Sequence, residues 1–252
     1  MPQVRIGTAG WSIPAAQAVH FRGEGTVLER YARVFNAVEI NSSFYRPHRP
    51  ATYAKWAAAT ADDFRFSVKM PRTISHLKRL RDCSEELAAF LAQVHALGDK
   101  LGCLLLQLPP SLRFDAETAW PFFDRLRTAT TARIVFEPRH ASWFSASVNR
   151  ALRERQIARV AADPPPVPRA IVCAGDRHTE YLRLHGAPRM YYDAYSAAAL
   201  QRIAQRAARP SSGTRERWII FDNTAQGYAC ENALQLRRRL GAGTSARTGD
   251  RR

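Results

Sequence analysis

The stretch LGCLLLQLPP, residues 101–110, is the part of the sequence that says most about the fold. Its first eight residues are nearly all apolar, and the run stops at Pro109 and Pro110. A strand buried on both faces has this pattern, because helices cover both sides of a parallel sheet. The run therefore predicts a central strand of a parallel α/β sheet.

Strand-like and helix-like segments alternate on both sides of this run. The strand candidates are residues 4–11, 37–45, 64–70, 101–108, 133–140, 157–162, 181–185 and 218–223. The helix candidates are residues 26–35, 51–60, 84–100, 115–129 (with an expected start near Pro121), 147–156, 197–208 and 228–240. Residues 163–179 are rich in proline and lack a helical stripe. The crossover helix after the sixth strand is therefore expected to be short or missing.

Eight strands that alternate with about seven helices favour a single (β/α)₈ barrel of the TIM type over an open doubly wound sheet. An open sheet more often carries a glycine-rich phosphate loop after its first strand, and Gly7-Thr8-Ala9-Gly10-Trp11 lacks that fingerprint. A chain of 252 residues also fits one barrel. We expect one domain over residues 1–240 and a basic, disordered tail over residues 241–252.

The charge balance of the chain is strongly basic. Lys and Arg number 38 against 22 Asp and Glu, which gives a formal net charge of +16 at pH 7. Most of the excess lies outside the tail, which holds Arg247, Asp250, Arg251 and Arg252. A positive field of this kind attracts anionic metabolites and polyanions such as nucleic acid.

Composition also points to a cytoplasmic protein that does not enter the membrane. No apolar run approaches the length of a membrane span, and the first residues lack the apolar stretch of a signal peptide. None of the four cysteines has the close spacing of a zinc knuckle or a redox pair, so four reduced thiols are expected.

Polar or aromatic residues gather near the C-terminal end of each strand candidate. They are Trp11; Glu39, Asn41 and Tyr45; Lys69; Gln107; Glu137, Arg139, His140 and, just beyond, Trp143; Asp163; Arg183 and His185; and Asp222 and Asn223. In a parallel barrel these strand ends open on one rim, where binding and catalysis take place. The pattern predicts a single functional site at that rim.

The alternation of strand residues gives these side chains a direction. Val38 and Ile40 alternate with Glu39, and Leu184 alternates with Arg183. Helices cover the outside of a barrel, so we expect the apolar set to face outward and the polar set to face the axis. Charges held there must pair with each other or with a ligand.

Six short motifs resemble those of the YecE-like family, also called domain of unknown function 72. They are Gly7-Thr8-Ala9-Gly10-Trp11, Glu39-Ile40-Asn41-Ser42-Ser43-Phe44-Tyr45, Leu105-Leu106-Gln107-Leu108-Pro109-Pro110, Glu137-Pro138-Arg139-His140-Ala141-Ser142-Trp143, Arg183-Leu184-His185-Gly186 and Phe221-Asp222-Asn223-Thr224. They follow the family's order over residues 4–240. The resemblance implies a TIM barrel and leaves the activity open, because none is established for the family.

Two positions depart from the family pattern. Pro138 stands where the family more often has an aromatic residue, and Asp222 stands where it more often has Asn. The second change adds a carboxylate to the rim, which argues against a mechanism that needs a neutral amide there.

The residue types at the rim suit acid–base chemistry on an anionic ligand. The expected catalytic residues are Glu39, Glu137, His140, Asp163, His185 and Asp222. The expected substrate-binding residues are Trp11, Asn41, Tyr45, Lys69, Gln107, Arg139, Trp143, Arg183 and Asn223, with Tyr191, Tyr192 and Tyr195 as further aromatic candidates. Carboxylates and imidazoles transfer protons, Lys and Arg bind phosphate or carboxylate, and aromatic rings stack on sugars or bases.

No cofactor is predicted. The carboxylates and histidines of this set are residue types that bind divalent metals. Ion pairing of the carboxylates with Lys69, Arg139 and Arg183 is favoured instead, because these cations repel a metal. No metal ligand is therefore assigned.

The leading hypothesis is an enzyme that acts on a small anionic or phosphorylated substrate. Glu39 and Glu137 are its acid/base candidates, and Lys69, Arg139 and Arg183 hold the anion. One alternative is an endonuclease-like, nucleic-acid-processing enzyme, and another is a non-catalytic barrel that binds a ligand or nucleic acid. Hydrolase, lyase and isomerase reactions stay open, as does the oligomeric state.

Overall fold

The computed structural model of the chain describes residues 2–248 and is an α/β structure. The strands are β1 (Gln3–Thr8), β2 (Ala37–Ile40), β3 (Arg65–Lys69), β4 (Leu101–Gln107), β5 (Arg133–Glu137), β6 (Ile157–Arg159), β7 (Ala161–Asp163), β8 (Ala174–Gly175), β9 (Thr179–Leu184) and β10 (Glu216–Phe221). The α-helices are α1 (Val27–Ala32), α2 (Ser42–Tyr45), α3 (Pro50–Ala58), α4 (Ser84–Val94), α5 (Ala116–Ala129), α6 (Ala146–Glu154), α7 (Ala197–Ala207) and α8 (Tyr228–Thr248). Short 3-10 helices are η1 (Ala15–His20), η3 (His95–Lys100), η4 (Ala141–Trp143) and η5 (Pro168–Ile171), and η2 (Thr73–Leu77) is a π-helical turn.

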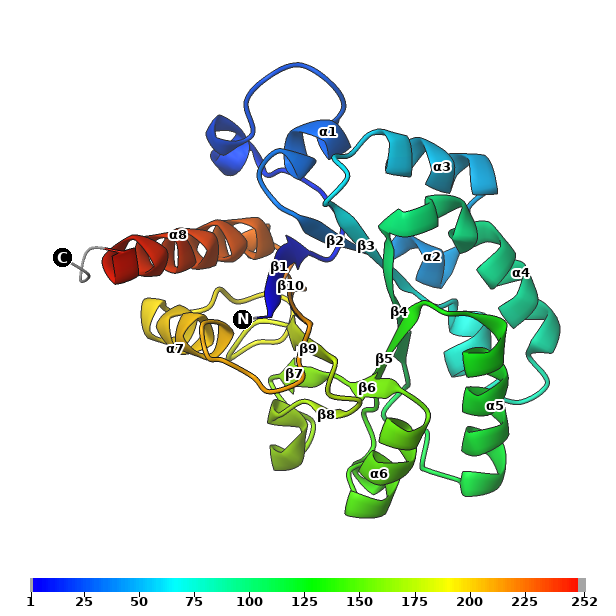
Figure 1. Cartoon of the computed structure of the whole chain (residues 1–252). Helices are drawn as coiled ribbons and strands as arrows, with labels where there is room; N and C mark the ends of the chain where they lie inside the picture. The colour runs from blue at the N-terminus through cyan, green and yellow to red at the C-terminus, as the bar shows by residue number, and fades with distance from the viewer. Residues whose placement is uncertain (1, 249–252) are drawn as a thin grey trace.

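The strands form two sheets whose pairing is almost entirely parallel. One has the order β1-β10-β9-β7, and the other has the order β2-β3-β4-β5-β6-β8. Only the short β8 runs antiparallel, to β6. Figure 1 shows the strands at the centre of the molecule, with α3 to α8 arranged around them. The parallel α/β class is confirmed, whereas the pairing of the described strands does not by itself establish the expected closed barrel.

The predicted central strand is confirmed as β4. Leu104 and Leu106 belong to the large apolar core that also includes the helices, whereas Cys103 and Leu105 belong to a second apolar cluster. Both faces of β4 are therefore buried, which explains the continuous apolar run.

The second apolar cluster, here called the inner cluster, is built from strand residues. Its buried members are Ala37, Cys103, Leu105, Val135, Ala158, Val160, Tyr181, Trp218 and Ile220. Val38 and Ile40, which alternate with Ala37 and Glu39, lie in the large core. The predicted alternation of the strands is therefore the one the structure has.

Glycine makes room for this close packing at two strand positions. A Cβ atom on Gly7 would lie 2.1 Å from the carbonyl oxygen of Ala37, so β1 approaches β2 only because Gly7 has none. A Cβ atom on Gly102 would lie 2.5 Å from the Trp218 ring, which fills the space beside β4.

Three predicted elements have different bounds in the structure. The strand expected over 37–45 ends at Ile40, because Ser43 donates to the carbonyl of Ile40 (3.1 Å) and stabilises the turn into α2. The helix expected over 84–100 ends at Val94 and continues as η3, where Gly98 has φ 56° and cannot extend an α-helix. The helix with Pro121 begins earlier, at Ala116, because Asp115 caps it.

The region around the predicted sixth strand also differs. Residues 157–162 form two short strands, since β6 pairs with β5 and β7 pairs with β9. The crossover that follows contains η5 and β8 but no α-helix, as the proline-rich sequence indicated.

At the C-terminal end, α8 runs to Thr248 and so crosses the predicted domain boundary at residue 240. The predicted tail falls partly within α8, and its residues 249–252 lie outside the described residues. No helix in the described part of the chain is both long and apolar enough to cross a membrane.

Candidate functional site

The register of the strands places the predicted polar residues side by side at the C-terminal ends of adjacent strands. Glu39 of β2 is paired with Ser67, Lys69 of β3 with Leu105, and Gln107 of β4 with Glu137 of β5. These positions lie at the C-terminal ends of their strands, where the end of β9 also places Arg183. Adjacent parallel strands therefore present their last polar side chains together.

Arg183 is the centre of the site and is completely buried. It binds Glu39 through Nε (3.0 Å) and Nη2 (2.7 Å), Glu137 through Nη1 (2.7 Å) and Asp222 through Nη2 (2.9 Å). Its Nη1 also donates to Gln107 Oε1 at 3.4 Å. A guanidinium has five N–H donors, and these contacts engage all of them. Arg183 thus holds three carboxylates and has no donor left for a ligand.

His185 joins two of the same carboxylates from the next inward position after Arg183. Its Nδ1 lies 3.0 Å from Asp222 Oδ2, and its Nε2 lies 3.2 Å from Glu137 Oε1 and 2.7 Å from Arg139 Nη2. Arg139 also forms an ion pair with Glu137. Because a carboxylate only accepts, the contact with Asp222 assigns a proton to Nδ1. Nε2 therefore faces one donor and one acceptor.

We call this set the strand-end cluster: Glu39, Glu137, Arg139, Arg183, His185 and Asp222. Beneath it, the hydroxyl of Tyr181 donates to Glu39 Oε2 at 2.8 Å and lies 2.9 Å from Ser67 Oγ. Tyr181 stacks on Trp218 with a centroid distance of 5.8 Å. The cluster therefore rests on the inner cluster, with Tyr181 as the polar link.

The pKa values within the cluster reflect burial opposed by charge. Burial by itself raises the pKa of Glu137, but Arg139 and Arg183 hold it well below the usual value for a glutamate. The pKa of Asp222 is likewise raised by burial, and Arg183 lowers it to below its usual value. Burial disfavours the Arg183 cation, yet Glu39, Asp222 and Glu137 together raise its pKa well above normal. The carboxylates and Arg183 thus keep each other ionised.

Lys69 lies beside the cluster in a different state. Its Nζ is 4.3 Å from the centre of the Phe44 ring and has no ion pair or hydrogen bond among residues 2–248. Burial and the positive charge of Arg183 lower the pKa of Lys69 to about 8, although nearby carboxylates oppose the shift. Lys69 is therefore a cation that has not been paired with a carboxylate.

Arg139 Nε within the cluster and Asn41 Oδ1 beside it are buried without a partner in the described part of the chain. The side-chain amide nitrogen of Asn41 does have a partner, because it donates to Asp222 Oδ1 at 3.4 Å. A buried polar atom without a hydrogen bond costs about 1–3 kcal/mol. Water or a ligand at this position would relieve that cost.

Six predicted site residues lie away from the cluster or contribute through other atoms. Trp143 is buried among Phe114, Phe123 and Phe136 in the large core, and its Nε1 donates to the Leu112 carbonyl at 2.9 Å. His140 accepts from the backbone N–H of Ser142 at 3.1 Å and so caps η4. Asn223 donates to Asn232 Oδ1 (2.9 Å) and to the carbonyl of Asp193 (3.0 Å), which secures the segment before α8.

Two more of these residues, Tyr45 and Trp11, lie in the segments that follow β2 and β1. Tyr45 is 73% exposed, and its ring packs edge-to-face with that of Phe44 on α2. Trp11 packs edge-on against Trp56, with ring centres 5.0 Å apart. Both lie after their strands have ended, so strand alternation does not direct their rings.

Asp163 contributes its backbone carbonyl, which accepts from the Tyr195 hydroxyl (2.9 Å) and from the backbone N–H of His185 (2.7 Å). Burial raises the pKa of its carboxyl group. Tyr191, one of the further aromatic candidates, packs edge-on against the His185 ring, with ring centres 5.4 Å apart. It is 36% exposed and so partly covers the histidine.

Sequence reasoning missed Tyr181, the residue that links Glu39 to the inner cluster. It stands two positions before Arg183 in the same strand, so its side chain lies on the same face of β9 as that of Arg183. Its apolar ring was the reason it was not counted with the polar set. Among residues 2–248, no group of three or more His, Cys, Asp and Glu side chains is arranged to hold a metal ion.

Comparison with known proteins agrees with this architecture. A family model described as "Protein of unknown function DUF72" matches residues 5–251. The UPF0759 protein YecE of Escherichia coli K12 is 35% identical over 170 residues, which cover 65% of this chain and 60% of YecE. The chain thus spans about three fifths of the length of that curated relative.

Solved structures of DUF72 family proteins have the same fold. One from Enterococcus faecalis V583 superposes with a TM-score of 0.78 at 20% identity, covering 95% of this chain and 96% of its own. Another, from Thermotoga maritima MSB8, gives a TM-score of 0.76 at 26% identity, covering 95% and 99%. The family match and the shared motifs together show that this chain belongs to the DUF72 family.

Proposed function

We propose that this chain is an enzyme that performs acid–base chemistry on a small anionic substrate at the strand-end cluster. The observation that carries the proposal is the position of His185 Nε2 between Arg139, which donates, and Glu137, which accepts. Without a proton, Nε2 accepts from Arg139; with a proton, it donates to Glu137. The imidazole can therefore gain or lose a proton and keep a partner in both states.

Asp222 and Glu39 have supporting roles in this proposal. Asp222 receives the proton of Nδ1 and fixes the orientation of the His185 ring, 3.0 Å away. Glu39 is bound by two nitrogens of Arg183 and by Tyr181, so it positions Arg183 and is not available as an acid or base. His185 is then the group that transfers the proton, and Glu137 is the acceptor beside its Nε2.

Lys69 and Arg139 are the groups that hold the anion. Lys69 has no carboxylate partner in contact within the described chain, and Arg139 Nε is buried without an acceptor. An anionic oxygen at this position would satisfy Arg139 Nε and approach the Lys69 ammonium group. Arg183, whose donors are all engaged, keeps the carboxylates in place beneath the anion.

We further infer that the two sheets form one closed barrel around this site. Ala9 forms a bridge to Glu39, which joins the ends of β1 and β2. At the other junction only Val160 separates β6 from β7, and its N–H donates to Phe136 of β5 at 2.8 Å. The inner cluster takes Val135 from one sheet and Tyr181 from the other, as the core of a barrel does.

A turnover screen tests the function. Purified full-length protein is incubated with a panel of sugar phosphates and sugar acids, and products are followed by NMR. Turnover in the parent should be lost in His185→Gln and reduced at least about tenfold in Arg139→Gln. Arg237→Gln, which removes an exposed arginine on α8, serves as the matched control and should retain full activity. Unchanged turnover in His185→Gln would show that the chemistry takes place elsewhere.

The formal net charge of +16 favours nucleic acid as a second candidate substrate. Binding of a duplex and a single-stranded oligonucleotide, measured at several salt concentrations, tests it. Specific contacts with phosphates predict a steep loss of affinity with salt, and a flat response would exclude this candidate.

A further inference from the structure

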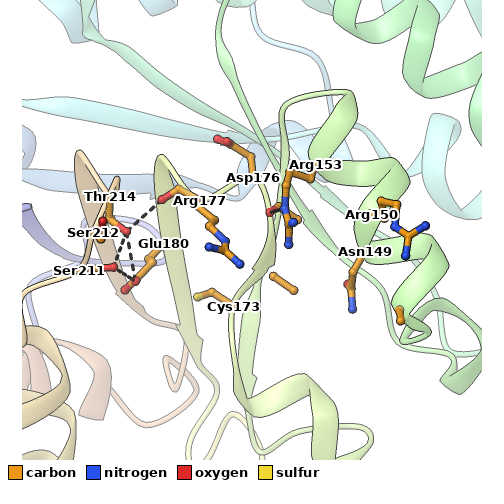
Figure 2. Close-up of a pocket in the computed structure, with 13 residues that line it drawn as sticks. Asn149, Arg150, Arg153, Cys173, Asp176, Arg177, Glu180, Ser211, Ser212 and Thr214 are labelled. Carbon is orange, nitrogen blue, oxygen red and sulfur yellow. Dashed lines mark hydrogen bonds between the residues drawn. The ribbon is translucent and has the colours of Figure 1, made fainter.

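A cavity lies near the opposite end of β9 from the strand-end cluster. It has a volume of about 600 Å³ and is formed by α6, the segment around β8 and the residues that precede β10. Figure 2 shows Asn149, Arg150 and Arg153 of α6 on one side, and Glu180, Ser211, Ser212 and Thr214 on the other. Glu180 stands near the start of β9 and Arg183 near its end, so the cavity is separate from the site described above.

Three arginines give this cavity a positively charged lining. Arg150, Arg153 and Arg177 line it, and all three are exposed to solvent. In the described chain, the guanidinium groups of Arg150 and Arg177 have no hydrogen bond or ion pair. Arg153 uses only its Nε, which donates to the carbonyl of Gly175 at 3.3 Å, so both of its terminal nitrogens are left for a ligand. Figure 2 shows Arg153 and Arg177 extending into the same space.

The carboxylates of the cavity are already engaged by other groups. Glu180 binds Arg217, which does not line the cavity, at 2.6 Å and also accepts from Ser211 at 3.1 Å. Asp176 is 2.8 Å from His178. The lining arginines are therefore left with excess positive charge that no carboxylate in contact offsets.

The shape and lining of the cavity narrow the kind of ligand. A volume of about 600 Å³ is in the range of small-molecule sites, which is roughly 300–1,000 Å³. No aromatic ring is among its lining residues, so a base or a sugar has nothing to stack on. Guanidinium groups bind phosphate with two parallel hydrogen bonds, and the hydroxyls of Ser211 and Ser212 lie on the facing wall.

We propose that this cavity binds a small molecule that carries two or more phosphate groups, with Arg150, Arg153 and Arg177 as its cationic ligands. Arg153 lies on α6 and Arg177 lies just before β9, so a ligand with two linked phosphates spans the cavity from one wall to the other. The site is independent of the acid–base function proposed above.

Isothermal titration calorimetry of the full chain with inorganic pyrophosphate and tripolyphosphate tests the proposal. The parent should bind one equivalent at this cavity. Arg153→Ala combined with Arg177→Ala should weaken binding at least about tenfold, as expected for the loss of charge-assisted hydrogen bonds. Arg153→Lys keeps the charge but loses the planar fork, and should give an intermediate affinity.

Two control variants make the result specific. Arg237→Ala removes one positive charge from the exposed surface of α8 and should leave the affinity unchanged. Lys69→Met combined with Arg139→Gln alters the strand-end site and should also leave it unchanged. Circular dichroism establishes that each variant is folded, and Arg150→Ala provides a further lining variant if the double variant is not.

Three results would overturn the proposal. Equal loss of affinity in Arg237→Ala would show attraction by net charge alone. Loss in the Lys69 and Arg139 variant would place pyrophosphate at the strand-end cluster. Binding of a short oligonucleotide that depends on Arg153 and Arg177, with no binding of pyrophosphate or tripolyphosphate, would identify a nucleic-acid surface instead.

Discussion

The two ends of the strands each hold a buried charged cluster, and the clusters differ in how completely their groups are paired. At the N-terminal ends, Glu216 binds Arg5 (2.9 Å), Arg133 (3.3 Å) and the Trp218 Nε1 (3.1 Å). The remaining donors of Arg5 bind the Asp63 carbonyl and Gln3. We call Arg5, Arg133, Glu216 and Trp218 the strand-start cluster. Within residues 2–248 it leaves no buried side-chain atom without a partner.

The strand-end cluster is more deeply buried, but it is not closed. Arg139 Nε and Asn41 Oδ1 have no partner in the described chain, and Lys69 stands beside three carboxylates without pairing with any of them. His185 can adopt either of two hydrogen-bonding arrangements. A cluster in which every polar group has a partner stabilises the fold. A cluster with unpartnered polar groups is suited to bind a ligand. This contrast matches the roles of the two ends in parallel barrels.

The largest expected effect comes from removing the centre of the strand-end cluster. Arg183→Met leaves Glu39, Glu137 and Asp222 buried without their main counter-charge. We expect the free energy of unfolding to fall by about 3–5 kcal/mol, because an uncompensated buried charge is costly. Urea denaturation followed by circular dichroism measures the change, with Arg237→Met as the control. A loss below about 1 kcal/mol would mean that the carboxylates do not depend on Arg183.

A smaller loss of stability is expected at the strand-start cluster. Glu216→Gln removes the partner of Arg5, but Arg5 keeps its bonds to the Asp63 carbonyl and Gln3. The expected loss is about 1–3 kcal/mol in the same urea assay. Binding of sulfate, measured by calorimetry, should stay at the parental value. If Glu216→Gln weakened sulfate binding as strongly as Arg139→Gln, the functional contrast between the two ends would be lost.

The position of the strand-end cluster could be predicted from sequence because strand alternation is regular. Glu39, Arg183 and Lys69 were predictable from their neighbours alone, since each alternates along a parallel strand with residues of the large core. Trp143 and His140 were not, because they follow the end of β5 and no strand period directs them. The division of residues 157–163 into β6 and β7 depends on long-range pairing with β5 and β9, which local pattern does not contain.

The ionisation of Lys69 provides a test that varies with pH. Its pKa is lowered to about 8 by burial and by Arg183, so the amine is protonated at pH 6–7 and loses its charge as the pH rises through about 8. Sulfate keeps a constant charge over this range. Its affinity should therefore be steady at pH 6–7 and fall severalfold by pH 9.

Two substitutions at the same position sharpen this result. Lys69→Arg stays charged and should bind sulfate with no decline up to pH 9. Lys69→Met should bind weakly, about tenfold less than the parent at pH 6, with no pH dependence in the range. A decline in Lys69→Met as steep as in the parent would assign the titration to another group.

The smallest expected effect concerns a residue that the sequence included in the site. Tyr45 is 73% exposed, and its ring packs against Phe44. Tyr45→Ala should change the free energy of unfolding by less than about 0.5 kcal/mol and leave sulfate binding unchanged. A clear loss of affinity would show that α2 closes over the ligand and extends the site beyond the strand-end cluster.

A crystal structure of the protein grown or soaked with sulfate tests the central claim most directly. We expect an anion bound to the Arg139 guanidinium group, Nε included, with Lys69 Nζ in contact and the bonds of Arg183 to Glu39, Glu137 and Asp222 intact. The contrary result is a strand-end cluster that stays free of the anion at saturating concentration, with Arg139 Nε and Asn41 Oδ1 bonded to each other or to the protein. That outcome would make this cluster as structural as the one at the start of the strands.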